Sequence, residues 1–497
     1  MRILQRPALV LGLVALALHL GANGGYDYFR DELYFIACGN HLAWGYVDQP
    51  PLVPWIARLA RTLTGDSLLG LRLVPALAAA GLAALTADAA RRLGGGLFAR
   101  WLAGIAILAA PFFVIGGLLL STDVLQPIAW LALTLAILEA IEQDRPNAWL
   151  VAGGIAGVAL LSKYMIAFYL VALLAGLLAT RYRTALLRPT PWLGIALILL
   201  IPLPNLLWQQ QHGWPFLELG AAAANGKNVV FGPLAYLGEE IKMLNPMTAP
   251  IWLAGLAWFA LSPRRWITIA WLVLMAIMLV AHGKPYYPAG IYPILLAGGA
   301  VAVERSLRPV WARGLCLAAV AATGVILLPL GLPILPIEQF IAYQRALGIV
   351  PETAERSGIG ILPQYYADMF GWREMTAAVG TAYQALPPED QARAVFLAGN
   401  YGEAGAIDFY GAAWHLPPAI SGHNNYYLWG PAGHDGSVVL RLGGTREALL
   451  KSYGSVEAVG RIEQPYAMPY ETGLPLWLCR DRKRSLEADW PEFKHYD

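Results

Sequence analysis

Charged residues are scarce in this chain. Only 14% of its 497 residues are Asp, Glu, Lys or Arg, while 57% are hydrophobic and the mean hydropathy is +0.50. A water-soluble protein of this size carries about 25% charged residues. The composition therefore excludes an ordinary soluble enzyme and predicts a polytopic membrane protein. The net charge of +2 gives no indication of a nucleic-acid partner or of an acidic one.

Cysteine is also rare, and sequence repeats are missing. The three cysteines, Cys38, Cys316 and Cys479, are far apart and form neither a metal-ligand motif nor a disulfide framework. A Cys38–Cys479 bridge would require both residues to lie outside the membrane, and nothing in the sequence demands it. We find no internal repeat, which argues against the repeat symmetry that many transporters show.

Long apolar runs, by contrast, are abundant. Eleven candidate membrane spans lie at residues 7–22, 69–90, 97–118, 123–141, 147–162, 164–180, 191–208, 247–261, 266–281, 286–303 and 311–330. Several are shorter than the ~20 residues that cross the hydrocarbon, so we expect some to tilt or to sit inside the bundle. The first run could be a signal peptide, but we predict that it is retained, because retention makes the topology consistent.

Arginines between the spans predict the orientation. With the N-terminus inside, every alternate short loop is rich in arginine. These loops carry Arg91, Arg92, Arg100, Arg145, Arg181, Arg183, Arg188, Arg264, Arg265, Arg305, Arg308 and Arg313. The outer face then receives the long loops 23–68 and 209–246, the short segments around residues 122, 163 and 283, and the C-terminal region. The unusual polar residues all fall on that face.

Residues 331–497 lack long apolar runs and are predicted to form a small soluble α/β domain outside the membrane, following the membrane domain 1–330. Strands are predicted at Arg393–Leu397, Ser437–Leu442 and Leu474–Cys479, and helices at Gln364–Leu386 and Thr445–Ser452. The loop Gly399–Gly405 lies between a predicted strand and a predicted helix. It has neither dinucleotide-loop spacing nor a Walker lysine, so we interpret it as a turn or cap rather than a phosphate loop.

Two adjacent carboxylates, Asp31 and Glu32, follow the first span. A charge at a bilayer is costly to desolvate, and acid–base chemistry on a membrane-bound substrate would explain the pair. The alternative is a solvated loop with scattered acids. Residues 34–44 have amphipathic helical spacing and are expected to lie in the membrane interface, which would hold the pair at headgroup depth.

Other polar residues on the outer face are candidate ligands. Asp123 is explained equally well as a helix cap and as a site acid. Three lysines could bind a phosphate, although Lys163 is also explained as a snorkelling anchor. Lys284 ranks first because Gly, Pro and two tyrosines surround it, ahead of Lys163 and Lys227. His212, His282 and His423 lack metal-ligand spacing, so no cofactor is expected, and a divalent metal is possible at Asp48 but not indicated.

These segments together resemble bacterial members of the protein mannosyltransferase superfamily, the GT-C glycosyltransferases of family 39, and more distantly the lipid A aminoarabinose transferases. The segments that carry the resemblance are Asp31-Glu32, Asp48–Leu52, Ser121–Asp123, Lys284–Pro288, Tyr401–Gly405 and Ser421–Asn425. The resemblance covers nearly the whole chain. It implies a polytopic helical GT-C fold and a sugar donor carried on a polyprenyl phosphate.

The resemblance also implies roles for individual residues. The catalytic set is Asp31 as the base, Asp123 as a second acid and Glu32 as a neighbour that positions Asp31. The aminoarabinose transferases have a Glu and a phosphate-binding Lys where this chain has Asp48 and Gln49. The donor-binding set implied here is therefore Lys284, Tyr286, Tyr287, Lys163, Lys227, Asp48 and Gln49. His423 and Asn424 are assigned to the acceptor.

The expected function is sugar transfer from a polyprenyl-phosphate donor to an envelope acceptor, either a glycolipid, a polysaccharide or a protein hydroxyl. Phosphate is a good leaving group, so the enzyme needs a base for the acceptor hydroxyl and cations for the departing phosphate. One displacement predicts inversion. We expect a monomeric hexosyl or pentosyl transferase in the bacterial inner membrane, with its active site on the periplasmic side. The alternatives are a membrane transporter and a non-catalytic scaffold for envelope assembly.

Overall fold

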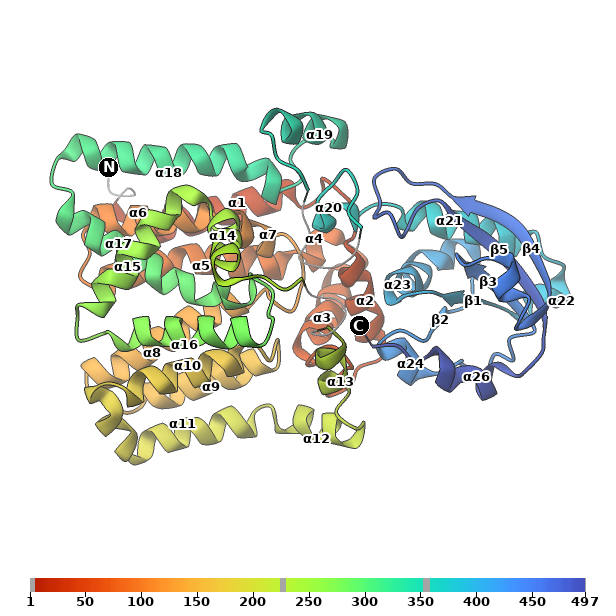
Figure 1. Cartoon of the computed structure of the whole chain (residues 1–497), viewed down its shortest axis with the longest axis horizontal. Coiled ribbons are helices and arrows are strands. Elements are labelled where there is room, and N and C mark those ends of the chain that lie inside the picture. The colour runs from red at the N-terminus through yellow and green to blue at the C-terminus, as the bar shows by residue number, and fades with distance from the viewer. Residues whose placement is uncertain (1–4, 224–228, 352–357, 497) are drawn as a thin grey trace.

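The computed structural model describes residues 5–223, 229–351 and 358–496. The chain folds into a bundle of helices joined to a part built on a five-stranded sheet (Figure 1). The sheet lies beyond one end of the bundle, and helices α2, α3 and α13 lie between the two parts. A helical bundle followed by a small α/β part is the architecture that the sequence predicts.

Helices α1 to α18 form the bundle and its connections. They are α1 (Pro7–Ala22), α2 (Arg30–Asn40), α3 (Leu52–Thr64), α4 (Leu68–Leu71), α5 (Leu73–Arg92), α6 (Leu97–Leu108), α7 (Pro111–Gly116), α8 (Gln126–Glu142), α9 (Ala148–Leu160), α10 (Ile166–Leu178), α11 (Pro189–Leu200), α12 (Leu203–Gln211), α13 (Pro215–Ala222), α14 (Pro233–Met243), α15 (Ala249–Ala260), α16 (Trp266–Val280), α17 (Tyr292–Ser306) and α18 (Val310–Gly331).

The eleven predicted spans are not confirmed as spans, although helices lie in each of the predicted ranges. Within the described ranges, three helical stretches are long and apolar enough to cross a membrane: Leu68–Arg92, Tyr287–Ser306 and Val310–Gly331. Two bent pairs, Ile166–Leu178 with Arg181–Leu187 and Pro189–Leu200 with Leu203–Gln211, bring the number to five. Breaks shorten the other helices. Pro111 opens α7, for example, and separates it from α6 within the predicted span 97–118.

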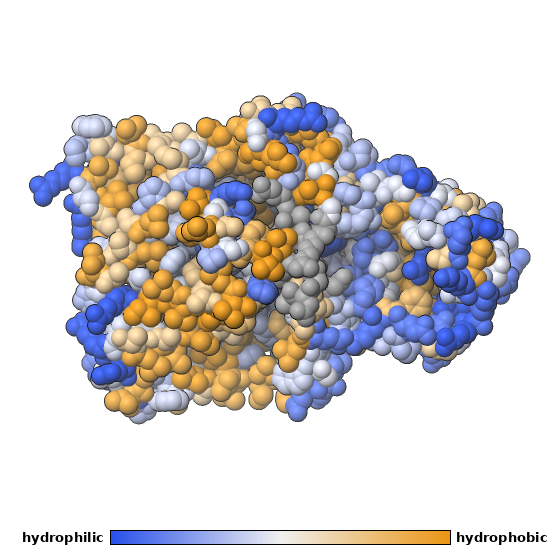
Figure 2. Space-filling model, viewed as in Figure 1, coloured by the Kyte–Doolittle hydropathy of each residue, from blue (hydrophilic) through white to orange (hydrophobic). Residues whose placement is uncertain are grey.

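Glycines let the helices of the bundle touch. Helices α15 and α17 cross where Gly299 faces Ile251, and a Cβ on Gly299 would lie 1.8 Å from the Ile251 carbonyl oxygen. Only a hydrogen fits there, so the two backbones approach as they do in membrane helix pairs with small residues at the contact. Hydrophobic residues cover the side of the bundle in Figure 2, whereas hydrophilic residues cover the sheet part and the opposite end.

Ion pairs and hydrogen bonds join the arginine-rich loops at the end of the bundle that is remote from the sheet (Figure 1). Arg264 contacts Glu142 at 2.7 Å, and both Arg92 and Arg145 contact Glu139. The loops that precede α9 and α16 therefore meet the end of α8. The opposite end of the bundle gathers the segments that carry the candidate site residues.

The α/β part contains the remaining elements. They are α19 (Ile337–Ala346), α20 (Gln364–Ala367), α21 (Trp372–Gln384), α22 (Pro388–Gln391), β1 (Ala394–Ala398), α23 (Tyr401–Tyr410), β2 (Ile420–Ser421), α24 (Asn425–Trp429), β3 (Val438–Leu442), α25 (Arg446–Leu449), β4 (Tyr453–Ile462), β5 (Leu474–Arg482) and α26 (Leu486–Phe493). The sheet order is β2-β1-β3-β5-β4. The strands β2, β1 and β3 are parallel to one another, β5 is antiparallel to β3, and β4 is antiparallel to β5.

The three predicted strands are confirmed and begin within one residue of their predicted starts. The predicted helix 364–386 is two helices, because Gly371 has a φ of +97° and separates α20 from α21. The strand β4 was not predicted, since polar residues and glycine interrupt its apolar residues. The loop at 399–405 is the start of helix α23, and Asn400 caps it by accepting hydrogen bonds from the amides of Gly402 and Glu403. The cap interpretation is therefore confirmed.

Helix α2 does not have the position expected for residues 34–44. It begins at Arg30, and its residues from Glu32 to Gly39 are buried, so protein covers it on all sides. Its apolar side chains share a hydrophobic core with β1, β3 and α23 of the α/β part. The expectation of a helix in the membrane interface is wrong, because the burial is provided by the second part of the chain. The neighbouring helix α3, by contrast, exposes Leu59 and Leu63.

Candidate active site

Asp31 lies in the first turn of α2, where α2 meets α23. Its Oδ1 accepts a hydrogen bond of 2.9 Å from the hydroxyl of Tyr401, and Arg30 Nε lies 3.5 Å from the same oxygen. The Asp31 side chain is 32% exposed. The carboxylate is therefore held on one oxygen and remains partly exposed, as a general base requires.

Glu32, its neighbour, is held in the opposite way. Its side chain is fully buried and forms a two-pronged ion pair with Arg72, at 3.0 and 2.8 Å. It also accepts hydrogen bonds from the backbone amides of Phe29 and Leu120. Each oxygen of the carboxylate accepts two hydrogen bonds, so the side chain is suited to fixing α2 in place and not to exchanging protons. The bond to Leu120 ties the first loop to the segment that carries Asp123.

Asp48 and Gln49 lie beyond α2 and contact it. Asp48 accepts a hydrogen bond of 2.9 Å from the Tyr34 hydroxyl. Gln49 is 1% exposed, and its amide lies 3.9 Å from the sulfur of Cys38. The burial of Gln49 disfavours a direct contact between its side chain and a donor phosphate. Cys38 and the other two cysteines are free thiols, so the Cys38–Cys479 bridge does not form.

Asp123 does not cap a helix. Helix α8 begins at Gln126, and its cap residue Leu125 makes no side-chain capping bond. Asp123 instead pairs with Lys163 across 2.6 Å. The ammonium of Lys163 also lies over the rings of Tyr286 and Tyr287, at 5.5 and 5.2 Å from their centroids. Lys163 is only 18% exposed, so it is drawn into the protein and does not extend toward solvent as a snorkelling anchor would.

Lys284 is close to one of the same tyrosines. Its ammonium lies 6.0 Å from the centroid of the Tyr286 ring, and its carbonyl accepts a hydrogen bond from Tyr236 on α14. Lys227 lies outside the described residues. The structure thus brings together Asp123, Lys163, Lys284, Tyr286 and Tyr287, which the sequence places in three separate segments.

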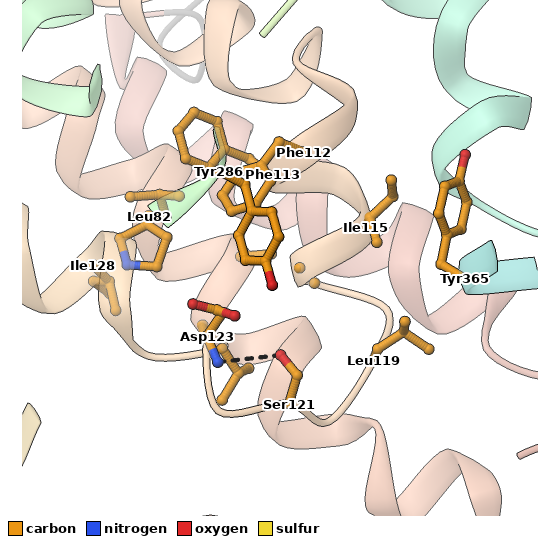
Figure 3. A pocket seen from close by; sticks show the side chains of 16 residues that line it. Leu82, Phe112, Phe113, Ile115, Leu119, Ser121, Asp123, Ile128, Tyr286 and Tyr365 are labelled. Atoms are coloured by element: carbon orange, nitrogen blue, oxygen red, sulfur yellow. Dashed lines mark hydrogen bonds between the residues drawn. The ribbon is translucent and has the colours of Figure 1, made fainter. Parts of the chain in front are cut away.

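An apolar cavity of about 290 Å³ opens beside this cluster. Its walls come from α5, α7 and α8, and are formed mainly by leucine, isoleucine, alanine and two phenylalanines, Phe112 and Phe113. Figure 3 shows the carboxylate of Asp123 and the hydroxyl of Tyr286 pointing into the same space, with Ser121 next to Asp123. A cavity that is apolar along its walls and polar at one end suits an amphiphilic ligand with an anionic head.

His423 and Asn424 are both buried, which disfavours direct contact with an acceptor. The ring of His423 packs at a tilt against the rings of Tyr401 and His495, with centroids 4.7 and 4.5 Å apart. The backbone amide of Asn424 donates a hydrogen bond to the carbonyl of His495, so the C-terminal segment holds Asn424 in place. Among the described residues, no group of three or more His, Cys, Asp and Glu side chains is arranged to hold a metal ion.

The site contains residues that the sequence did not single out, chiefly Arg72, Tyr34 and Tyr401. Arg72 lies in a predicted span, so its charge was a signal for a buried partner. Burial raises the pKa of the Tyr34 and Tyr401 phenols well above the usual value, so both remain hydrogen-bond donors. Tyr401 belongs to a segment that was noted, but only contact with Asp31 in three dimensions reveals what it does.

Two further carboxylates lie near Arg30. Glu403 and Glu471 are both buried, and the side-chain amide of Asn400 donates to each of them. Burial raises the pKa of Glu403 to about 7 and raises that of Glu471 well above its usual value. Both acids belong to the α/β part, and Glu403 follows Tyr401 by two residues in α23.

Comparison with known proteins first shows which class of protein this chain is similar to. Residues 48–208 match the family described as dolichyl-phosphate-mannose-protein mannosyltransferase. The lipid A galacturonosyltransferase RgtD of Rhizobium johnstonii is 27% identical over 188 residues, which are 37% of this chain and 39% of that protein. The matched stretch therefore spans about two fifths of the curated relative. The resemblance to GT-C glycosyltransferases that the sequence motifs indicate is confirmed.

The solved structures then identify the particular fold. ArnT from Cupriavidus metallidurans matches with a TM-score of 0.63 at 15% identity, covering 94% of this chain and 97% of that one. The match is equally good to ArnT bound to undecaprenyl phosphate and to ArnT in the apo state. This chain has the ArnT fold over nearly its whole length, including the α/β part.

Proposed function

We propose that this protein is a membrane glycosyltransferase that moves a hexosyl or pentosyl group from a polyprenyl phosphate to an acceptor of the cell envelope. The acceptor that we propose first is a glycolipid of the lipid A type, because the relative RgtD is a lipid A galacturonosyltransferase. Polysaccharides and protein hydroxyls are the alternatives. The reaction is a single displacement with inversion at the anomeric carbon.

The cavity beside Asp123 carries the proposal. Its apolar walls suit the first isoprene units of a polyprenyl chain, and Asp123 and Tyr286 line its polar end. Both of these residues contact Lys163, whose ammonium supplies a cation for the phosphate. ArnT, which has the same fold, was solved with undecaprenyl phosphate bound. Lys163 is our first phosphate ligand, because it is paired with Asp123 and lies over both tyrosine rings.

The residue types divide the chemistry between two acids. Asp31 accepts the proton of the acceptor hydroxyl as that oxygen attacks the anomeric carbon. Lys163, held in place by Asp123, stabilises the negative charge that grows on the phosphate as the glycosidic bond breaks. Glu32 keeps α2 fixed through Arg72 and so keeps Asp31 in position. No general acid is needed, since the leaving phosphate is already stable as an anion.

The location of the site follows from the same proposal. The arginine-rich loops gather at the end of the bundle opposite to the sheet, and positively charged loops stay in the cytoplasm. We therefore place the active site and residues 331–497 on the periplasmic side of the bacterial inner membrane. Residues 1–330 are then the membrane domain, and the protein acts as a monomer.

Sugar transfer by the purified protein tests the proposal. Full-length protein in liposomes is given lipid A and undecaprenyl phosphate linked to galacturonic acid, aminoarabinose, mannose or glucose, and the lipids are analysed by mass spectrometry. We expect lipid A that has gained one sugar from at least one donor, and none with Asp31→Asn. Movement of a donor across the bilayer without any transfer to lipid A, a polysaccharide or a peptide would favour the transporter.

A further inference from the structure

The α/β part reaches the proposed base through the side chain of Tyr401. Tyr401 is the first residue of α23, and its hydroxyl donates the 2.9 Å hydrogen bond to Asp31 Oδ1. Asp31 itself belongs to α2, 370 residues earlier in the chain. The proposed base and the group that holds it thus come from the two different parts of the molecule.

Three neighbours fix the ring of Tyr401. It lies 4.6 Å from the ring of Tyr34 and 4.7 Å from that of His423, and the guanidinium of Arg30 lies over it at 5.1 Å. The side chain is 8% exposed. With its ring enclosed in this way, the hydroxyl has little freedom to leave Asp31. Burial also raises the pKa of the phenol well above its usual value, so the hydroxyl keeps its proton.

Two glycines in α23 make this contact possible. A Cβ on Gly402 would lie 2.4 Å from Arg30 Cγ, and a Cβ on Gly405 would lie 3.1 Å from the Leu33 carbonyl carbon and 3.2 Å from the Tyr34 amide nitrogen. Because the neighbours of Gly405 are backbone atoms, they cannot turn aside as a side chain can. Helix α23 therefore rests directly on α2, and this closeness sets the distance between Tyr401 and Asp31.

We propose that Tyr401 is a positioning residue for the sugar transfer: it holds one oxygen of Asp31 so that the other faces the acceptor hydroxyl. The inference rests on the proposed function, since it assumes that Asp31 is the base. It makes the α/β part a component of the catalytic machinery and not an appendage. The segment Tyr401–Gly405 then positions the proposed base, which is a different role from binding a phosphate or only starting a helix.

Other charged groups face this contact and must be considered in any test based on pH. Arg30 lies between Asp31 and Asp368, at 3.5 and 3.9 Å, and also contacts Tyr470. The remaining groups are Asp48, whose negative charge influences Tyr401, and the pair Glu403 and Glu471, of which Glu471 is influenced by the charge of Arg30. None of these changes when only the Tyr401 hydroxyl is removed.

The test compares Tyr401→Phe with Tyr410→Phe in the full-length protein. Tyr410 is a matched control, because it lies on the same helix and donates a hydrogen bond of the same length, 2.9 Å, to Asp27. Both variants keep the ring and lose one hydroxyl bonded to an aspartate of the first outer loop. Sugar transfer is measured from the undecaprenyl-phosphate donor that the wild-type protein uses, with lipid A as acceptor, over a range of pH.

We expect Tyr401→Phe to lower kcat by about 10- to 100-fold with the donor KM changed less than about threefold, because a misplaced base slows chemistry and not binding. In the wild-type protein the Tyr401 hydrogen bond stabilises the charged carboxylate. Its loss should therefore move the acid limb of the pH–rate profile to higher pH. Tyr410→Phe should keep the wild-type rate and profile. Gly405→Ala, which leaves the hydroxyl but displaces α23, should reproduce both changes.

Equal rates and pH profiles for the two tyrosine variants would overturn the inference. Losses of activity in both variants that are explained by their lower thermal stability would overturn it too. If Tyr401→Phe fails to fold, Gly405→Ala decides, and a wild-type pH profile for it would count against the inference. The proposed function fails separately: in that case the wild-type protein transfers no sugar, or Asp31→Asn transfers it normally. An active wild type, an inactive Asp31→Asn and a normal Tyr401→Phe would reject only the role of Tyr401.

Discussion

The two acids of the candidate site are held by different kinds of partner. Asp31, where α2 meets α23, accepts a hydrogen bond from a neutral phenol, has Arg30 Nε at the longer distance of 3.5 Å, and keeps a partly exposed carboxylate. Asp123, at the end of the apolar cavity, is bonded directly to the ammonium of Lys163. A carboxylate bound to a phenol retains a basic oxygen, whereas one bound to a lysine serves to fix the cation. The comparison indicates one acid for the proton and one for the phosphate.

The same comparison extends to the parts of the chain that supply the partners. Asp31 depends on the α/β part, through Tyr401, while Asp123 depends on the bundle, through the end of α9 and the segment before α17. On the proposed function, acceptor chemistry belongs to the contact between the two parts. Donor binding belongs mainly to the bundle, although Tyr365 of the α/β part also lines the cavity. Variants on either side should separate the two functions.

The largest effect is expected for Asp31→Asn. Loss of a general base costs about 10²- to 10⁴-fold in rate, and the asparagine can still accept the Tyr401 hydrogen bond, so the fold should persist. The rate constant of sugar transfer and the binding of undecaprenyl phosphate are measured together. Binding should be unchanged. Transfer within tenfold of wild type would remove Asp31 from the mechanism.

Glu32→Gln should act on stability instead. It leaves the buried Arg72 without its counter-charge, and breaking a buried ion pair costs about 3–5 kcal/mol. Thermal unfolding in detergent should show a lower midpoint and a lower yield of folded protein. Glu139→Gln, at the opposite end of the bundle and more exposed, is the control and should change the midpoint little. A stable but inactive Glu32→Gln would instead give Glu32 a direct part in the chemistry.

Lys163→Met tests the donor side of the comparison. It removes the cation at the end of the cavity, so it should raise the donor KM and lower kcat, by about 100-fold in kcat/KM. The matched variant is Lys284→Met, whose ammonium lies farther from the tyrosines and should cost about tenfold or less. A larger loss from Lys284→Met would make Lys284 the principal phosphate ligand, as its sequence context alone suggests.

The smallest effect concerns pH and stability. Burial raises the pKa of Glu403 to about 7 from an unfolded value near 4.5, so the folded protein holds a proton that the unfolded chain has lost between these values. Stability should therefore fall as pH rises through that window. Between pH 5 and 8 the midpoint of thermal unfolding should fall by a few °C less in Glu403→Gln than in the wild-type protein. An identical pH dependence in wild type and variant would show that Glu403 is ionised in the folded state.

Much of the architecture could be predicted from the sequence, because apolar runs and alternating strands are local signals. Helices occupy the predicted ranges, and the three predicted strands begin where expected. The number of spans could not be predicted, since breaks such as the one before Pro111 decide whether an apolar run forms one long helix. The position of α2 was missed because its apolar residues fit an interface helix as well as a buried one.

The acids of the candidate site could be predicted from the sequence, but the residues that bond to them could not. Asp31, Asp123 and Lys163 are unusual where they stand in the sequence, so each could be identified alone. That Asp123 bonds Lys163, and Asp31 bonds Tyr401, depends on contacts across 40 and 370 residues. No short pattern encodes such contacts. The glycines at 402 and 405 were visible, but their purpose is clear only when α2 is placed beside them.

The anomeric configuration of the product is the most direct test of the account, whose central claim is one displacement with Asp31 as base. Nuclear magnetic resonance of the glycolipid made by the wild-type protein, from a donor of known configuration, reports it. The account predicts complete inversion with the wild-type protein and no product with Asp31→Asn. A product that retains the donor's configuration would require a second carboxylate to act as nucleophile, and would contradict the division of roles between Asp31 and Asp123.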